Sequence, residues 1–154
     1  MSRAPVATVG RMSPPARTVR RRRTAAAIAL VVIVAAGLVV HRLAPSSVAT
    51  DVAGDALYAV AVYTGLVMLF ASARPALLGA LAVAWCVAVE LFQLTGAPVA
   101  LAAAFPPAAL VLGTGFDARD LVVYPLAVVV AAAVDATVAR RRGMTAGERG
   151  LEST

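Results

Sequence analysis

The sequence predicts an all-α membrane domain with four transmembrane helices, and three observations lead to this prediction. Hydrophobic residues make up 61% of the 154-residue chain and charged residues only 14%, whereas a soluble domain has about 45–50% apolar and about 25% charged residues. The apolar residues form runs long enough to cross a bilayer. The 14 basic side chains, all of them arginine, gather mostly outside those runs. A chain of this length allows one domain.

Four apolar runs are predicted to span the membrane. Each is about 18–20 residues long, which at 1.5 Å per residue approaches the roughly 30 Å thickness of the hydrocarbon core. The first run could instead be a cleaved signal peptide that ends at Ser47-Val48-Ala49, but the apolar runs that follow favour a retained span. The predicted spans are 24–43, 52–70, 75–94 and 121–138.

Both ends of the chain are predicted to be basic tails outside the membrane. Residues 1–23 contain seven arginines and three prolines. Proline breaks helices and like charges repel, so we expect this N-terminal tail to be disordered. Residues 139–154 form the basic C-terminal tail.

An apolar segment between the third and fourth predicted spans contains helix-breaking prolines. Residues 97–112 include Pro98 and the pair Pro106-Pro107. A continuous helix through adjacent prolines loses backbone hydrogen bonds that lipid cannot replace. We therefore expect a re-entrant or interfacial segment here and not a fifth crossing.

The placement of arginine gives the predicted bundle a direction. With four spans, twelve of the 14 arginines lie on one side of the membrane, and only Arg42 and Arg119 lie on the other. The positive-inside rule assigns the arginine-rich side to the cytoplasm. We therefore expect a multi-pass protein of the inner cell membrane with both termini in the cytoplasm. Basic residues that flank apolar runs indicate topology, so no nucleic-acid partner is expected.

Polar residues are predicted to converge on the extracytoplasmic end of the bundle. The second span begins at that face, the third ends there and the fourth begins there, so three helices bring acidic residues to one level. Ionisable residues in membranes are functional candidates because their burial in hydrocarbon is costly. The predicted outer-face polar cluster consists of Asp55, Tyr58, Glu90, Gln93, Asp117, Arg119 and Asp120.

The acidic members of this cluster have structural alternatives. Asp55 and Asp120 could be helix-start residues that accept hydrogen bonds from free backbone N–H groups. Glu90 lies near a helix C-terminus, where the helix dipole disfavours negative charge. We therefore expect Glu90 to have a basic partner, either Arg42 or Arg119.

The remaining polar and aromatic residues predict no second site. Asp135 is expected to reach water or Arg140 at the cytoplasmic end of its span. Cys86 is expected to be a buried, inert thiol. The chain has one cysteine and one histidine and no metal-ligand motif, so no metal or cofactor is expected and no catalytic residue is identified. The residues expected to be packing or interfacial-belt aromatics are Tyr58, Tyr63, Trp85 and Tyr124.

The polar motifs follow one another in a recognisable order. In chain order they are Gly54-Asp55-x-x-Tyr58, Arg74, Glu90-x-x-Gln93-Leu94 and Leu112-Gly113-x-x-Phe116-Asp117-x-x-Asp120-x-x-x-Tyr124. This set resembles domain-of-unknown-function family 2809, small bacterial membrane proteins with no assigned activity, over roughly residues 41–138.

A more distant likeness is to VanZ-like proteins. It is carried by Glu90, Gln93, Arg119 and Asp120, which match that family's order. Tyr124 and Pro125 depart from the Asn and Gly stretch that the VanZ-like pattern has after its Asp.

Three functions are compatible with the pattern. In the favoured one, the polar cluster binds a cell-envelope lipid or amphiphile. In the second, the cluster is structural and the protein acts as a scaffold held together by interhelical hydrogen bonds. The third is an intramembrane enzyme in which two carboxyl groups act as general base and acid. An ion pathway is disfavoured, because the cytoplasmic half of the bundle holds only Asp135 as an acid. The sequence predicts no oligomeric state.

Overall fold

The computed structural model describes residues 16–113 and 115–151, and this part of the chain contains helices and no strands. Four helices are long and apolar enough to cross a membrane. They are α1 (Ala16–Leu43), α2 (Val48–Leu69), α3 (Pro75–Gln93) and α6 (Asp120–Leu151), of which α6 offers Asp120–Arg141 as its span. Two short helices, α4 (Ala97–Ala104) and α5 (Ala108–Leu112), lie between α3 and α6. The predicted fold class is therefore confirmed.

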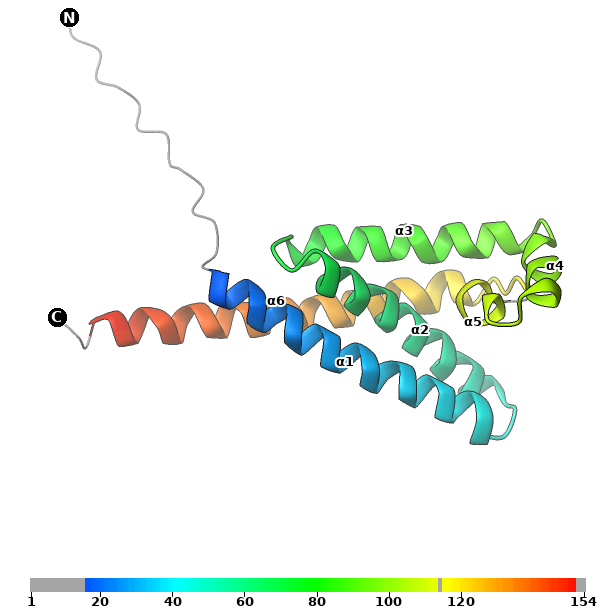
Figure 1. Ribbon diagram of the computed structural model, residues 1–154, viewed down its shortest axis with the longest axis horizontal. Helices are drawn as coiled ribbons and strands as arrows, with labels where there is room; N and C mark the ends of the chain where they lie inside the picture. The colour runs from blue at the N-terminus through cyan, green and yellow to red at the C-terminus, as the bar shows by residue number, and fades with distance from the viewer. Residues whose placement is uncertain (1–15, 114, 152–154) are drawn as a thin grey trace, which may run out of the picture.

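The long helices alternate in direction, so the bundle has two distinct ends (Figure 1). The arginine end holds the start of α1, the α2–α3 turn and the second half of α6. The polar end holds the α1–α2 connection, the end of α3 and the start of α6. Helices α4 and α5, which make up most of the segment 97–112, lie at the polar end and do not cross the bundle.

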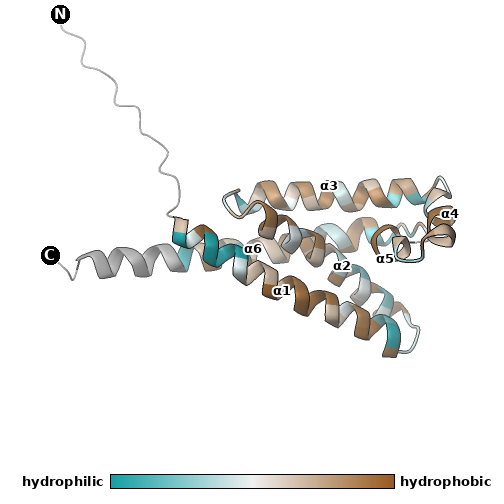
Figure 2. Cartoon of the chain, in the orientation of Figure 1, coloured by the Kyte–Doolittle hydropathy of each residue, from teal (hydrophilic) through white to brown (hydrophobic). Residues whose placement is uncertain are grey.

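The outward-facing surfaces of the long helices are hydrophobic (Figure 2). Large apolar side chains such as Val31, Leu77 and Leu126 are more than half exposed. Soluble monomers rarely leave such extended apolar surfaces uncovered. The surface fits surroundings of lipid, as the composition predicted.

Helix α1 begins earlier than its predicted span. It starts at Ala16, so residues 16–23, which were expected to be disordered, are helical, and this part of the prediction is wrong. Arginine is a good helix former, and the breaking prolines precede Ala16. The expected tail residues 1–15 lie outside the described residues. Helix α6 likewise continues through Leu151, into the segment 139–154.

Helix α2 begins at Val48, four residues before its predicted start, because the preceding residue caps it. The Ser47 hydroxyl accepts a hydrogen bond from the Thr50 N–H at 3.3 Å, and the Ser47 N–H donates to the Thr50 hydroxyl at 2.9 Å. These two bonds form a capping box, which satisfies backbone groups that are otherwise free at a helix start.

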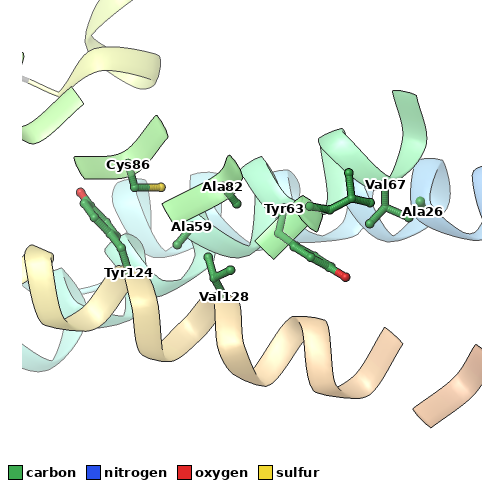
Figure 3. Close-up of a cluster of buried hydrophobic side chains, with 9 residues drawn as sticks. Ala26, Ala59, Tyr63, Val67, Ala82, Cys86, Tyr124 and Val128 are labelled. Atoms are coloured by element: carbon green, nitrogen blue, oxygen red, sulfur yellow. The ribbon is translucent and has the colours of Figure 1, made fainter. Parts of the chain in front are cut away.

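Small residues allow α2, α3 and α6 to pack closely (Figure 3). Ala59 of α2, together with Ala82 and Cys86 of α3, is completely buried, and Val128 of α6 packs against the same cluster. Small side chains at helix interfaces are typical of membrane bundles, where close backbone approach supplies the packing energy. Cys86 is buried, as expected.

The connection from α5 to α6 depends on a glycine. Gly113 has φ +63° and ψ −174°, a conformation that essentially only glycine adopts. A Cβ added there would lie 2.4 Å from the side-chain nitrogen of Gln93. That nitrogen donates to the carbonyl oxygen of Leu112 at 2.7 Å, so the close approach of Gln93 and Gly113 fixes α5 against α3.

Substitution of Gly113 by alanine is expected to destabilise the fold by about 1–3 kcal/mol, through backbone strain and the clash with Gln93. Thermal unfolding of the purified protein in detergent measures the effect. Gly115→Ala is the matched control in the same connection, because an added Cβ at Gly115 meets no atom within 4 Å. Equal losses in the two variants would contradict the argument.

Candidate functional site

Three carboxyl groups meet at the polar end, one each from α2, α3 and α6. They belong to Asp55, Glu90 and Asp120. The Glu90 side chain is 0% exposed and Asp120 is 7% exposed, whereas Asp55 is half-buried. The Asp55 carboxyl group interacts with that of Asp120 and, more weakly, with that of Glu90. These three residues are the acidic centre of the cluster.

The hydroxyl group of Tyr124 lies between two of these carboxyl groups. Its oxygen is 3.1 Å from Oε1 of Glu90 and 3.2 Å from Oδ2 of Asp120. A phenol has one proton to donate. It can share that proton between the two carboxyl groups, or donate it to one of them and accept a hydrogen bond from the other when that one is protonated. The arrangement is suited to holding a shared proton in the bundle interior.

The partner expected for Glu90 is not the one observed. Its second oxygen accepts a hydrogen bond from the Asp117 N–H at 3.2 Å, and neither Arg42 nor Arg119 contacts it. The expectation of a basic partner was therefore wrong. The guanidinium of Arg119 is already bound by the carboxylate of Asp117, which lies only two residues before it in the chain.

Asp117 and Arg119 form an exposed pair in the turn that leads into α6. The Asp117 carboxylate accepts hydrogen bonds from the Arg119 backbone N–H at 2.9 Å and from its side-chain Nε at 2.8 Å. These bonds from Arg119 lower the pKa of Asp117. The stabilisation that they give is present above the ordinary pKa of aspartate and is lost as the pH falls through the lowered value.

Tyr58 and Gln93 attach α5 to the long helices. The Tyr58 hydroxyl donates to the Val111 carbonyl oxygen at 2.7 Å and accepts a hydrogen bond from the Trp85 indole at 3.1 Å. Gln93 donates to the Leu112 carbonyl oxygen, as described above. These carbonyl groups belong to the last turn of α5, where no intrahelical donor is available. The two side chains therefore satisfy backbone groups and do not contact the carboxyl centre through hydrogen bonds.

The seven residues of the predicted cluster thus divide into three groups. Asp55, Glu90 and Asp120 come together, the Tyr58 and Gln93 side chains anchor α5, and Asp117 pairs with Arg119 in the exposed turn. The helix-start alternative is wrong for Asp55, because α2 begins seven residues earlier. Asp120 does lie in the first turn of α6, but the hydrogen bond that its side chain accepts comes from the Tyr124 hydroxyl and not from a backbone N–H.

Sequence reasoning missed the central role of Tyr124, which was expected to be a packing or belt aromatic. Its ring does pack, with its centroid 5.9 Å from that of Tyr58. Its hydroxyl is nevertheless the only group that bridges Glu90 and Asp120 among the hydrogen bonds of the described residues. The spacing of four residues from Asp120 was an available signal, because residues i and i+4 share a helix face.

A second polar site lies at the arginine end. The Arg22 guanidinium donates to the Asp135 carboxylate, at 2.6 Å for the shorter bond, and to the carbonyl oxygens of Ala71 and Ala73 at 2.7 Å each. The Tyr63 hydroxyl donates to the same carboxylate at 2.8 Å. Asp135 was expected to reach water or Arg140, and this expectation was wrong. The site was missed because Arg22 was assigned to a disordered tail.

An apolar groove of about 870 Å³ has α2 as its floor and α1 and α6 as its walls, and α1 lines it only from Arg22 to Ala29, at the arginine end. Alanine and valine supply most of its lining. On α2 it extends from Val52 to Val67 and on α6 from Val123 to Val138, which is about 22 Å at the helical rise. Arg22 and Asp135 line it at the arginine end.

The described residues contain no group of three His, Cys, Asp or Glu side chains that could hold a metal ion together. The two polar sites can donate and accept hydrogen bonds and hold protons, and the groove can hold an apolar chain. These are the chemical capabilities from which a function must be argued.

Replacement of Tyr124 by phenylalanine is expected to destabilise the fold by about 1–3 kcal/mol, because Glu90 and Asp120 then lose the donor between them. Unfolding in detergent at neutral pH measures the loss. Adding Glu90→Gln to this variant is expected to restore part of it, because an amide can donate to Asp120 without a charge. A Tyr124→Phe variant as stable as the native protein would contradict the bridging role of the Tyr124 hydroxyl.

Comparison with known protein families gives one result for this chain. The family described as "Protein of unknown function (DUF2809)" matches residues 43–128, which is more than half of the chain and includes the whole polar cluster. Arg22 and Asp135 lie outside the matched range. No curated protein and no solved structure matches. The chain therefore belongs to the DUF2809 family of proteins of unknown function.

Proposed function

We propose that this protein binds a lipid or another amphiphile within the membrane, and that the apolar tail of the ligand lies in the groove between α1 and α6. The observation that carries the proposal is the groove itself. Its volume of about 870 Å³ falls within the range of about 300–1,000 Å³ that is usual for small-molecule sites. Its apolar lining suits a hydrocarbon chain.

Small side chains line the groove on α1 and α2, among them Ala25, Ala29 and Ala56. They leave room for a flexible hydrocarbon chain along the groove. If the groove were empty, the side chains of its walls would lose dispersion contacts. An occupied groove is therefore favoured over an empty one.

The polar cluster has a supporting role in this proposal. Glu90 is fully buried, and its two oxygens contact the Tyr124 hydroxyl and the Asp117 N–H. These contacts favour a function in holding α3 and α6 together over direct recognition of a ligand.

Carboxyl-dependent catalysis is the second candidate. The sharing of the Tyr124 hydroxyl by Glu90 and Asp120 favours it, because two carboxyl groups within reach of one another can act as acid and base. The burial of Glu90 weighs against it, since a substrate needs access to the reacting group.

The proposal includes an orientation, in which the arginine end faces the cytoplasm of a cell membrane. The excess of arginine on that side supports it. Alkaline phosphatase, which is active only outside the cytoplasm, is expected to be active when fused after Ser46 or Gly96 and inactive after Gly143. The opposite pattern would reverse the orientation.

Filling the groove is expected to reduce lipid binding. In Ala29→Phe, the added ring occupies space that the tail would use, and retention should fall about tenfold, which corresponds to the burial of about two methylene groups. Native mass spectrometry of the full chain, extracted in mild detergent from phospholipid vesicles, counts the lipid molecules that remain bound. Ala56→Phe, in the floor of the groove, is expected to behave in the same way.

Ala35→Phe is the matched control. It makes the same substitution on the same helix at an exposed position outside the groove lining. Its retention of lipid should equal that of the native protein. Equal retention in Ala29→Phe, Ala56→Phe and Ala35→Phe would contradict the proposal.

A further inference from the structure

We infer that α4 and α5 form a re-entrant segment, in which α5 turns back into the hydrocarbon at the polar end and its exposed side chains contact lipid tails. The sequence predicts either a re-entrant or an interfacial position for residues 97–112, and the hydrogen bonds of α5 distinguish the two. None of the described residues that line the groove belongs to α4 or α5, so the inference is independent of the proposed function.

The segment has the surface of a lipid-facing element. Residues 97–112 contain no charged or hydrogen-bonding side chain. Leu110 and Val111 of α5 are 58% and 50% exposed, and Phe105, which precedes α5, is 63% exposed. In water these side chains would form an uncovered apolar surface at the end of the bundle. Hydrocarbon is the environment that complements them.

The end of α3 marks the boundary of the hydrocarbon at the polar end. Helix α3 has 19 residues, which at the helical rise is about 28 Å and matches a hydrocarbon core of about 30 Å. Trp85 precedes Gln93, the last residue of α3, by eight positions, so it lies about 12 Å below this boundary. Helical side chains lean toward the start of their helix, which for α3 is the arginine end, so the indole lies no nearer to the boundary.

Two hydrogen bonds connect the level of Trp85 to α5. The indole donates to the Tyr58 hydroxyl at 3.1 Å, and this hydroxyl donates to the Val111 carbonyl oxygen at 2.7 Å. The Val111 oxygen is therefore within about 6 Å of the indole nitrogen, and it lies at least about one helical turn below the end of α3. In Figure 1, α4 lies across the end of the bundle, whereas α5 is set back alongside the long helices. The last turn of α5 is thus inside the hydrocarbon boundary.

This depth explains why protein side chains bind the carbonyl groups of α5. Within hydrocarbon no water can bind the free carbonyl groups at the end of a short helix, and irregular backbone is tolerated only where the protein satisfies it. The Tyr58 hydroxyl satisfies Val111, and the Gln93 amide satisfies Leu112 at 2.7 Å. At a wet surface, water could take both roles. These two side chains therefore hold α5 at its depth.

Collisions of a spin label with two probes test the position of α5. The label is attached at Leu110→Cys in the full chain, with Cys86→Ala to remove the native thiol, and the protein is reconstituted in phosphatidylcholine vesicles. Oxygen concentrates in hydrocarbon, whereas a neutral nickel chelate stays in water. The ratio of oxygen to nickel-chelate collisions should be at least about tenfold higher at Leu110→Cys than at Ser46→Cys, because hydrocarbon excludes a polar solute. Ser46 is the matched control, since it is exposed in the α1–α2 connection at the same end.

Two other results would overturn the inference. Equal collision ratios at Leu110→Cys and Ser46→Cys would place α5 in water or among the lipid head groups. Exclusion of both probes from Leu110→Cys would place a second copy of the chain, or another protein, against α5.

Tyr58→Phe tests the hydrogen bonds that hold α5. Without the hydroxyl, the Val111 carbonyl has no donor at membrane depth, so α5 should move toward water and nickel-chelate collisions at the label should rise about fivefold or more. Gln93→Met, which removes the donor to Leu112, should act in the same way.

Tyr63→Phe is the matched control for Tyr58→Phe. It removes a hydroxyl that binds Asp135 at the arginine end, so collisions at the label should stay at the native level. Equal changes in Tyr58→Phe and Tyr63→Phe, or unchanged collisions in both Tyr58→Phe and Gln93→Met, would overturn the inference that these bonds hold α5 in the hydrocarbon.

Discussion

The rest of the structure depends on one constraint, which is that a buried polar group in hydrocarbon must find its partner within the protein. Each end of the bundle satisfies it differently. At the polar end, Glu90 is bound by the Tyr124 hydroxyl and the Asp117 N–H, which joins α3 to α6. At the arginine end, Asp135 is bound by Arg22 and Tyr63, which joins α6 to α1 and α2. Between these ends the contacts are apolar and rely on small side chains.

The position of α1 follows from this distribution of polar contacts. It packs along α2, and its start is tied to α6 through Arg22 and Asp135. The same guanidinium binds carbonyl groups of the α2–α3 turn, so one side chain of α1 binds both α6 and that turn at the arginine end. No comparable polar bond joins α1 to α6 further along the described residues, and small residues such as Ala25 and Ala29 do not fill the space between them. The groove therefore results from two features: the Arg22–Asp135 ion pair joins α1 to α6 at one end only, and the side chains along the walls are small.

The predictable features were those that depend on length and depth. Hydropathy located the four spans, and the rise per residue placed Asp55, Glu90 and Asp120 at one level once the topology was known. The choice of partners depends on how each helix is rotated and packed, which periodicity does not specify. Glu90 was therefore expected to bind Arg42 or Arg119, whereas Arg119 is bound by Asp117 and Glu90 by the Tyr124 hydroxyl and the Asp117 N–H. Arg22 and Asp135 are 113 positions apart, so no local pattern connects them. The groove left no signal either, because alanine and valine look the same in sequence whether they pack against a helix or face an open space.

Helix α2 explains how a bound tail and a rigid polar cluster can coexist. One of its faces presents Ala56 and Val60 to the groove, while the adjacent face presents Asp55 to the carboxyl centre and Ala59 to the buried core. A tail that enters the groove therefore displaces no hydrogen bond of the cluster, and no buried carboxyl group has to lose its partner. For the proposed ligand, the free energy of binding would then come mainly from apolar contacts along the groove. This separation is the physical reason to expect that substitutions in the groove change lipid retention, whereas substitutions in the cluster change stability.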